Sequence, residues 1–388
     1  MKRKQLFKRY IRTIHLWLGL TTGLAVFIVS ITGAIYVFQE EINLLLQAGV
    51  YKNVEPEDKS LLSPLAVKEK AEDFFQQRII YMNATVYPKG DRATIVWARD
   101  SARKYTAIVQ NPYSGEVIHS YPYNVNFWAI ILGLHTHLLI PNIGSHIVNI
   151  STLVYIIMII SGIILWYPKR KKHLKQRLTI KWGTSPKRLN YDLHNVLGFY
   201  MSWVIIFVVL SGLIISYDWM KNSAYWVATG GGKAVAQERI VSNPQTDAVK
   251  LTDNAGKSLD SIISAYKNLD NYFLVYAIKE NDYHQLTLNT KDGFFYNRHD
   301  YYAIDQYTGD ILKKDLWENK NSGDRLLEAN LNIHIGAILG FPGKVLAFFA
   351  SLISASLPVT GFLIWRGRKK KHKKQKIRKP EARLFIQS

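Results

Sequence analysis

The sequence predicts an α-helical membrane protein with four transmembrane helices, two α+β extracytoplasmic modules and an internal duplication. Three observations lead to this fold class. Four apolar runs are each long enough to cross a bilayer, large polar segments separate them, and histidine and glycine motifs recur at fixed offsets along the chain.

The four apolar runs comprise residues 14–38, 143–166, 196–219 and 345–365. Each has at least 20 residues, and a helix of about that length crosses a hydrocarbon core ~30 Å thick. The first run is too long for a secretory signal and is not followed by a small-residue cleavage site, so we expect an uncleaved anchor. The predicted order is therefore a cytoplasmic N-terminus and helix in 1–39, an outer module in 40–126, a helix in 127–167, a cytoplasmic loop in 168–190, a helix in 191–219, an outer module in 220–327, a helix in 328–366 and a basic tail in 367–388.

The net charge of +21 is unevenly distributed. Residues 1–12, 168–190 and 366–388 hold 26 of the 50 basic residues. The outer segments are nearly balanced, with 10 basic and 11 acidic residues in 40–126 and 13 and 16 in 218–330. This is the positive-inside pattern: it places both termini and the 168–190 loop in the cytoplasm, next to membrane lipid, and argues against nucleic acid as a partner.

Cysteine is absent from the chain. The absence excludes thioether-attached haem, cysteine-ligated iron–sulfur clusters, disulfides and thiol chemistry. Any haem must therefore be held without a covalent bond.

Two series of matched residues indicate the duplication. An offset of 179 relates His15 to His194 and Gly19 to Gly198, and it also relates Thr32-Gly33 to Ser211-Gly212. An offset of 199 relates His135 to His334, Ser161-Gly162 to Thr360-Gly361 and Trp166 to Trp365. Imidazoles repeated at both ends of membrane helices are the layout expected of a two-haem electron-transfer protein. The Ser/Thr-Gly pairs we interpret chiefly as close helix contacts in lipid.

Each outer segment has the pattern of a small α+β module. Helical spacing of apolar residues predicts helices at Leu65–Gln77 and near Ser258–Lys267, and short alternating runs predict strands. The predicted strands are Thr94–Trp97, Tyr105–Val109, Tyr272–Ile278 and His284–Asn289. Gly115 and Gly309 are expected to supply the positive φ of hairpin turns. His119, His284 and His299 lack metal-ligand spacing, and we expect ordinary surface or turn residues there.

His15 and His194 are the predicted axial ligands of a haem at the cytoplasmic ends of the first and third membrane helices. An ionisable residue in a span is costly and is by default a functional candidate. Gly19 and Gly198 follow four residues later on the same helix face, leaving room for a porphyrin. Arg12 and Arg188 lie nearby in the sequence and could bind the haem propionates. Asp192 is interpreted as a helix-start residue.

His135 and His334 are the predicted ligands of a second, outer haem. Each lies 31 residues before the matched tryptophan, which a straight helix would extend over ~46 Å. Either these histidines sit at the outer surface, or the helices break near Pro141-Asn142 and Pro342-Gly343 and fold back. His146 is a third candidate for the outer haem, although it has no twin in the repeat. His137 is expected to be solvated.

The helix motifs, HLWLG…TG, LHxxLL…SGxxLW, DLHNxLG…SG and HxGxxxG…TGFLIW, resemble those of the PepSY-associated transmembrane helix family. The turn motifs of the outer segments are similar to PepSY domains. The resemblance covers residues 10–365. It implies a bacterial inner-membrane protein that uses two b-type haems to reduce a ferric siderophore, or another Fe(III) chelate, outside the cytoplasm.

Two functions follow as expectations. The first is a transmembrane di-haem ferric-siderophore reductase that receives electrons from a quinol or a protein. The alternative is a haem-free, membrane-anchored PepSY protein that binds or senses a ligand through its outer modules, with helices that serve as anchors.

Overall fold

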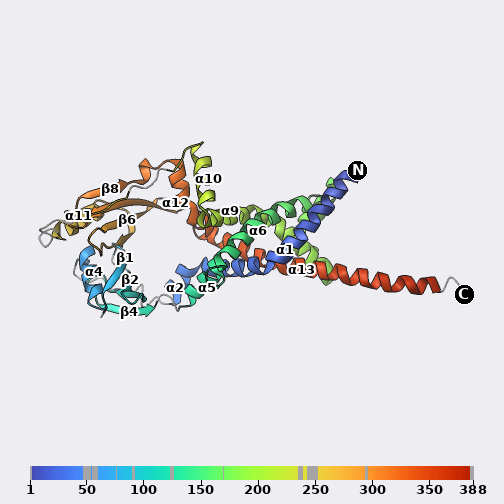
Figure 1. Ribbon diagram of the computed structural model, residues 1–388, viewed down its shortest axis with the longest axis horizontal. Helices are drawn as coiled ribbons and strands as arrows, with labels where there is room; N and C mark the ends of the chain where they lie inside the picture. The colour runs from blue at the N-terminus through green and yellow to red at the C-terminus, as the bar shows by residue number, and fades with distance from the viewer. Residues whose placement is uncertain are drawn as a thin grey trace.

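The computed structural model describes residues 2–46, 54, 60–75, 77–89, 92–122, 126–168, 170–234, 239–242, 252–292 and 296–384. The protein is elongated, with a β-sheet at one end and a bundle of long helices at the other (Figure 1). Both chain termini lie beyond the bundle, at the end farthest from the sheet.

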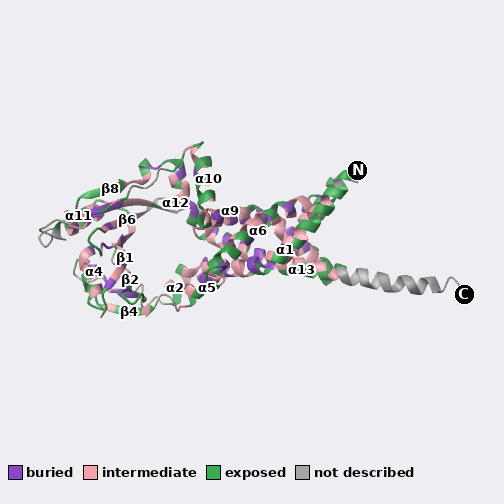
Figure 2. Cartoon of the chain, in the orientation of Figure 1, coloured by how far each residue is buried: buried purple, intermediate pink, exposed green. Residues whose placement is uncertain are grey.

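Four helices are long and apolar enough to cross a membrane, as predicted. They are α1 (Lys2–Tyr36), α6 (Gly144–Trp166), α9 (Gly198–Ser216) and α13 (Gly340–Leu384). Only 22–28 % of the most apolar window of each helix is buried inside the protein. Much of the remaining apolar surface is exposed along the bundle (Figure 2), as a lipid-facing bundle requires.

The third span begins earlier than the sequence predicts. Its helical path starts at α8 (Pro186–Asp192), passes through a π-helical turn at Leu193–Leu197 and continues as α9. Asp192 is therefore not a helix-start residue. It lies inside the helix, buried, in an ion pair with Arg188 (Nε–Oδ2 2.9 Å).

The chain breaks before the second and fourth spans. Helix α5 (Phe127–His137) ends at Leu138 and Leu139, which both have positive φ, and α12 (Ser322–His334) ends before Gly336, also with positive φ. Both breaks are tight: a Cβ on Gly144 would lie 1.8 Å from the His137 carbonyl oxygen, and one on Gly343 would lie 2.1 Å from that of Gly336. Of the two sequence alternatives, the structure shows the broken, folded-back helices.

Smaller elements complete the chain. At the sheet end of the bundle lie α2 (Gln39–Leu46) and α10 (Asp218–Thr229), and α7 (Leu174–Leu178) follows a 3₁₀ turn, Lys171–His173, in the loop between the second and third spans. Two further 3₁₀ turns, Trp317–Asn319 and Ala337–Leu339, flank α12. The two helices of the outer segments are α4 (Pro64–Glu72) and α11 (Thr252–Ser264).

The two outer segments form one continuous antiparallel sheet. Its eight strands are β1 (Ile79–Val86), β2 (Thr94–Asp100), β3 (Tyr105–Gln110), β4 (Val117–Pro122), β5 (Leu269–Val275), β6 (Tyr283–Asp292), β7 (Tyr296–Asp305) and β8 (Ile311–Asp315). Their order is β4-β3-β2-β1-β5-β6-β7-β8, so each segment contributes one half. The halves join where β1 pairs with β5, with Ala84 opposite Leu274. Each half thereby covers an edge strand that would otherwise expose unpaired backbone groups.

One face of the sheet packs on α4 and α11 and forms the larger core. Its fully buried residues include Met82 and Val96 from the first half, Leu274 and Leu286 from the second, and Leu259 from α11. Both halves and both helices thus contribute to this core, and a smaller cluster around Ala93 and Val109 belongs to the first segment alone.

Gly115 and Gly309 turn the β3–β4 and β7–β8 hairpins with φ of +74° and +76°, as predicted. A Cβ on Gly309 would lie 2.6 Å from the backbone oxygen of Asn254, whereas one on Gly115 would first meet the Lys70 side chain. Both positions disfavour any L side chain, but only Lys70 can move aside.

We therefore expect Gly309→Ala to lower the stability of the sheet by more than Gly115→Ala does. The strain of the left-handed backbone costs about 1 kcal/mol at either site, and the backbone clash adds to it at Gly309 alone. Thermal unfolding of the two variants measures the difference, and equal losses would contradict this geometry.

His284 lies on β6 and is buried, not at the surface as predicted. Its Nδ1 accepts a hydrogen bond from the Ala277 N–H (3.2 Å). Burial, with a smaller contribution from Lys68, lowers the His284 pKa to about 4. The unfolded chain, with a histidine pKa near 6.5, thus binds a proton first as the pH falls.

The sheet should therefore lose stability as the pH falls from about 6.5 to about 4, by up to ~3 kcal/mol from this residue. His284→Gln should flatten that part of the profile relative to the wild type. Unfolding free energies measured across this range test it, and an unchanged slope in the variant would refute the assignment.

Candidate cofactor site

Four histidines lie in two pairs at opposite ends of the helix bundle. We call the end that carries the chain termini and the 168–190 loop the basic end, and the opposite end the sheet end. His15 of α1 and His194 line one cavity of about 380 Å³ at the basic end. At the sheet end, the rings of His135 on α5 and His334 on α12 lie 6.0 Å apart between centroids, at 64°.

Along α1 the two pairs are separated by most of a bilayer thickness. His15 is on this helix, and the ring of His135 lies against Gly33 of the same helix. Eighteen residues of α-helix rise roughly 27 Å. The pairs are thus placed toward opposite faces of a membrane that the bundle would cross.

At the basic end each imidazole bonds a hydroxyl on the neighbouring span. His15 Nδ1 lies 2.7 Å from Ser161 Oγ on α6, and His194 Nδ1 lies 2.8 Å from Thr360 Oγ1 on α13. Each hydroxyl can also donate to a backbone carbonyl of its own helix, that of Met158 or Ser356. A hydroxyl has one hydrogen to donate and can also accept, so the contact occupies Nδ1 whichever of the two atoms donates.

At the sheet end each imidazole bonds a backbone carbonyl. His135 Nδ1 lies 2.8 Å from the Val29 oxygen on α1, and His334 Nδ1 lies 2.9 Å from the Val208 oxygen on α9. A carbonyl can only accept, so Nδ1 is the protonated nitrogen of these two rings, and each neutral ring keeps its lone pair on Nε2. In all four rings a hydrogen bond occupies Nδ1, as it does in metal-ligating histidines whose second nitrogen is fixed by a hydrogen bond.

A glycine lies against each of the four rings. An added Cβ would approach Cε1 of the ring to 2.9 Å for Gly33 on His135, 3.0 Å for Gly212 on His334, 3.3 Å for Gly361 on His194 and 3.5 Å for Gly162 on His15. These four glycines belong to the Ser/Thr-Gly pairs, and the hydroxyl residue before each glycine lies near Nδ1 of the same ring. At the sheet end, Thr32 Oγ1 lies 3.4 Å from His135 Nδ1, and Ser211 Oγ lies 3.1 Å from His334 Nδ1.

Sequence reasoning therefore misjudged the Ser/Thr-Gly pairs, which it assigned chiefly to helix packing. Each pair holds one histidine: the glycine makes room for the ring and the hydroxyl bonds it. The signal was present, because the pairs recur at the same two offsets as the histidines. The sequence does not predict which Ser/Thr-Gly pair contacts which histidine.

The basic-end cavity contains most of the other predicted residues. Gly19, Gly198 and Arg12 line it, although the nearest side chains to Gly19 and Gly198 are Met158 and Leu357 rather than the imidazoles. Arg188 does not line it. Lys8, Arg177 and Arg368, which the sequence did not single out, do.

His194 lies within the π-helical turn Leu193–Leu197, whereas His15 lies in regular α-helix. Single π turns insert one residue into a helix and occur often at functional sites. This turn lets the helix begin at Pro186 and still direct His194 to Thr360. The repeat does not predict that His194 lies in a π turn while His15 lies in regular α-helix.

The structure does not bring His146 or His137 to either pair. His146 is exposed on the first turn of α6, where the chain has only just left the break after α5. His137 is exposed and bonds Thr136 Oγ1 through Nδ1 (2.8 Å), in agreement with the solvated residue that we expected.

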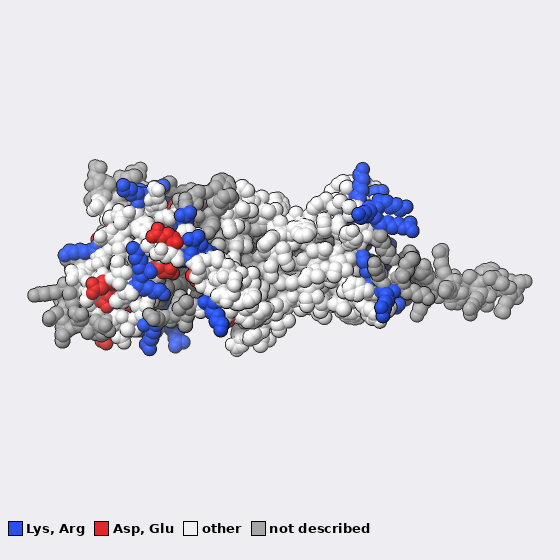
Figure 3. All heavy atoms as spheres, turned by 90° about the horizontal axis from the view of Figure 1, so that it is seen from above, with Lys and Arg blue, Asp and Glu red and all other residues white. Residues whose placement is uncertain are grey.

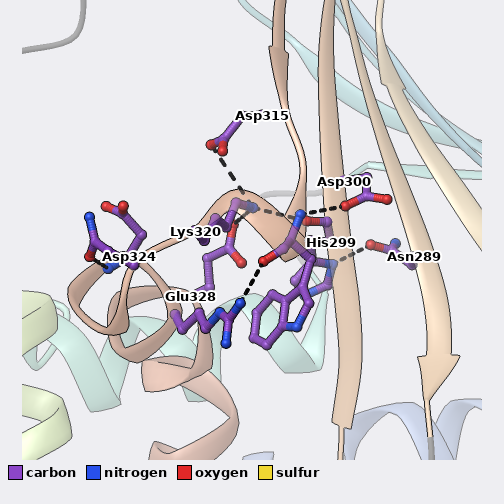
Figure 4. A network of polar contacts seen from close by, with 10 residues as sticks. Asn289, His299, Asp300, Asp315, Lys320, Asp324 and Glu328 are labelled. Carbon is purple, nitrogen blue, oxygen red and sulfur yellow. Dashed lines mark hydrogen bonds and ion pairs between the residues drawn. The ribbon is translucent and has the colours of Figure 1, made fainter.

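Helix α12, which carries His334, is tied to the sheet by a buried lysine. The Lys320 side chain is 2 % exposed and forms an ion pair with Glu328 of α12. It also donates to the His299 carbonyl of β7 (2.9 Å) and lies 3.9 Å from Asp315 of β8 (Figure 4). Beside it, His299 Nδ1 bonds Asn289 Oδ1 of β6. The sheet and a histidine-bearing helix are thus joined through one buried ammonium group, whose carboxylate partners are partly exposed, and removing those partners would leave a buried charge unpaired.

A protein-family model described as the PepSY-associated TM region matches residues 12–368. The match spans all four membrane helices, both outer segments and all four paired histidines. No curated protein matches the chain.

The glycine contacts give a stability test that needs no cofactor. Gly33→Ala and Gly212→Ala should each destabilise the bundle by about 1–3 kcal/mol, because a methyl group would push His135 or His334 off its carbonyl. Gly162→Ala, with 3.5 Å of room, should be tolerated. Thermal unfolding in detergent compares the three, and a loss at Gly162 equal to that at Gly33 would contradict it.

Proposed function

The chain belongs to the PepSY-associated transmembrane family, and from this membership and its four paired imidazoles we propose a di-haem b-type reductase. Electrons pass from the cytoplasmic side to a ferric siderophore, or another Fe(III) chelate, on the far side of a bacterial inner membrane. The two haems are held by His15 with His194 and by His135 with His334.

One observation carries the proposal: in all four rings a hydrogen bond to another helix occupies Nδ1, which leaves Nε2 for a metal. Histidines that merely anchor a helix at an interface have no reason to share this arrangement. Four of four do so here, from four different helical segments. A fixed imidazole is the usual protein contribution to haem ligation.

The sheet-end pair fits a shared iron by distance. Two nitrogen–metal bonds of about 2 Å, plus the distance from each nitrogen to its ring centre, total roughly 6 Å. The ring centroids are 6.0 Å apart.

The basic-end pair fits haem by its surroundings. Five glycines, Gly19, Gly23, Gly162, Gly198 and Gly361, line the cavity between the helices, beside apolar and aromatic side chains such as Trp166 and Phe199. The volume of about 380 Å³ lies in the range of small-molecule sites. Arg12 and Arg177 lie on its wall, where they can bind propionates.

Bound haem would supply a one-electron couple. The residues of this chain determine the rest: two imidazoles per iron leave no open position for oxygen, and the apolar spans exclude water from the route. The Nδ1 hydrogen bonds raise the basicity of each ligand and fix its orientation. Without cysteine in the chain, the haem is of the non-covalent b type.

The charges support the orientation. Lysine and arginine gather at the basic end, with a band almost free of charge between them and the sheet (Figure 3). Under the positive-inside rule the basic end is cytoplasmic, and the sheet stands outside with the His135–His334 pair nearest to it. An incoming chelate would meet that pair first.

The sheet supplies a surface suited to a chelate. On the face away from α4, Trp97 and Tyr105 stack at 6.1 Å and Tyr81 stacks on Tyr105 at 6.3 Å. Aromatic planes bind the rings and apolar arms of organic chelators. Reduction then weakens the complex, because hard oxygen donors hold Fe(II) less tightly than Fe(III).

We expect a red protein with two haems per chain when it is purified from haem-replete cells. His15→Ala or His194→Ala should remove one haem, His135→Ala or His334→Ala the other, and His137→Ala and His146→Ala neither. Pyridine haemochrome quantification of each variant gives the count. A colourless wild type would favour the haem-free binding or sensory protein instead.

A further inference from the structure

A second cavity opens at the basic end, beside the one that holds His15 and His194. Its volume is about 530 Å³. The two cavities adjoin, because Lys8, Arg12, Arg177, Tyr191 and Asn195 line both. Asn195 follows His194 directly, so a ligand in the second cavity lies beside the basic-end pair.

Cations dominate the wall of this cavity. Five of the described residues that line it, Lys8, Arg12, Arg170, Arg177 and Arg188, are basic, and one, Asp192, is acidic. Asp192 is already paired with Arg188. Lys8 donates to the Tyr167 carbonyl (2.7 Å) and Arg177 to the Tyr191 hydroxyl (2.8 Å).

Arg12 and Arg170 differ from the other cations of this wall. Among the residues that the structure describes, neither guanidinium has an ion pair or a hydrogen bond. Arg12 comes from α1 and Arg170 from the loop after α6, so groups far apart in the chain converge on one hollow. The positive-inside rule explains why basic residues lie on the cytoplasmic side, but it does not explain why they surround a cavity.

Haem propionates do not account for all of this charge. Arg170 and Arg188 line the second cavity and not the first, while Arg368 lines the first and not the second. The cations on the wall of the first cavity can serve two propionates. Arg170 remains, turned toward a separate space.

We propose that this second cavity binds a phosphate ester. Arginine forks match phosphate oxygens in pairs, and the tyrosines Tyr167 and Tyr191 in the wall can donate to further oxygens. The phosphate belongs either to a lipid headgroup in the inner leaflet or to a soluble compound. This site could also anchor a phosphate-bearing electron donor next to the basic-end haem. That role rests on the proposed function, whereas phosphate binding does not.

The test uses the full chain, delipidated in neutral detergent, with inorganic pyrophosphate as the probe in titration calorimetry at low salt. The wild type should bind it saturably. Arg170→Gln should weaken binding about tenfold. Arg170→Lys should weaken it less, because lysine keeps the positive charge but lacks the paired N–H groups of the guanidinium. Lys187→Gln is the matched control, an exposed cation of α8 that lines neither cavity, and should bind as the wild type does.

A lipid arm identifies the source of the phosphate. If phosphatidylglycerol displaces pyrophosphate and phosphatidylcholine does not, the natural ligand is a lipid headgroup; if neither does, it is soluble. Either result supports the site. Absence of saturable binding, or an equal loss in Lys187→Gln, overturns it. The same preparations are also assayed for haem content, which tests the proposed function, and for the unfolding temperature of each variant, which tests folding. A failure of the phosphate site can then be distinguished from either of these.

Discussion

The structure depends on how four imidazoles are satisfied inside a helix bundle. A polar ring among apolar helices must find a partner, since no water is present to supply one. Here each Nδ1 forms a hydrogen bond with a hydroxyl or a carbonyl of the neighbouring span, and a glycine gives the ring room. These contacts set the orientation of each ring and therefore the direction of its Nε2.

The same contacts explain why the helices break. A straight helix through His135 would carry this residue far from α1. The turns after α5 and α12 instead fold the short helices back along α1 and α9, so that His135 reaches Val29 and His334 reaches Val208. The close approach of Gly144 and Gly343 to carbonyls across each break makes the bends compact. At the far side, the Lys320–Glu328 pair anchors α12, which carries His334, to the second half of the sheet.

Much of this layout could be predicted from the sequence. The four spans follow from hydropathy and length, the hairpin glycines from the turn pattern, and the pairing of His15 with His194 and of His135 with His334 from the offsets. Pairing across the sheet could not be predicted, because the β1–β5 junction joins residues almost two hundred positions apart and no local pattern encodes it. The π turn at His194, the burial of His284 and the position of Arg188 in an ion pair also depend on tertiary contacts. His146 was a candidate by its place in the sequence alone, and only the path of the chain after α5 shows that it is exposed.

The central claim is that both imidazole pairs ligate iron through Nε2. Low-temperature electron paramagnetic resonance of the oxidised, full-length protein tests it most directly. We expect low-spin ferric signals from two haems, each with two imidazole ligands, and the loss of one signal in His135→Ala with the other unchanged. High-spin signals with an open axial position, or two unaltered low-spin signals in His135→Ala, would contradict the account.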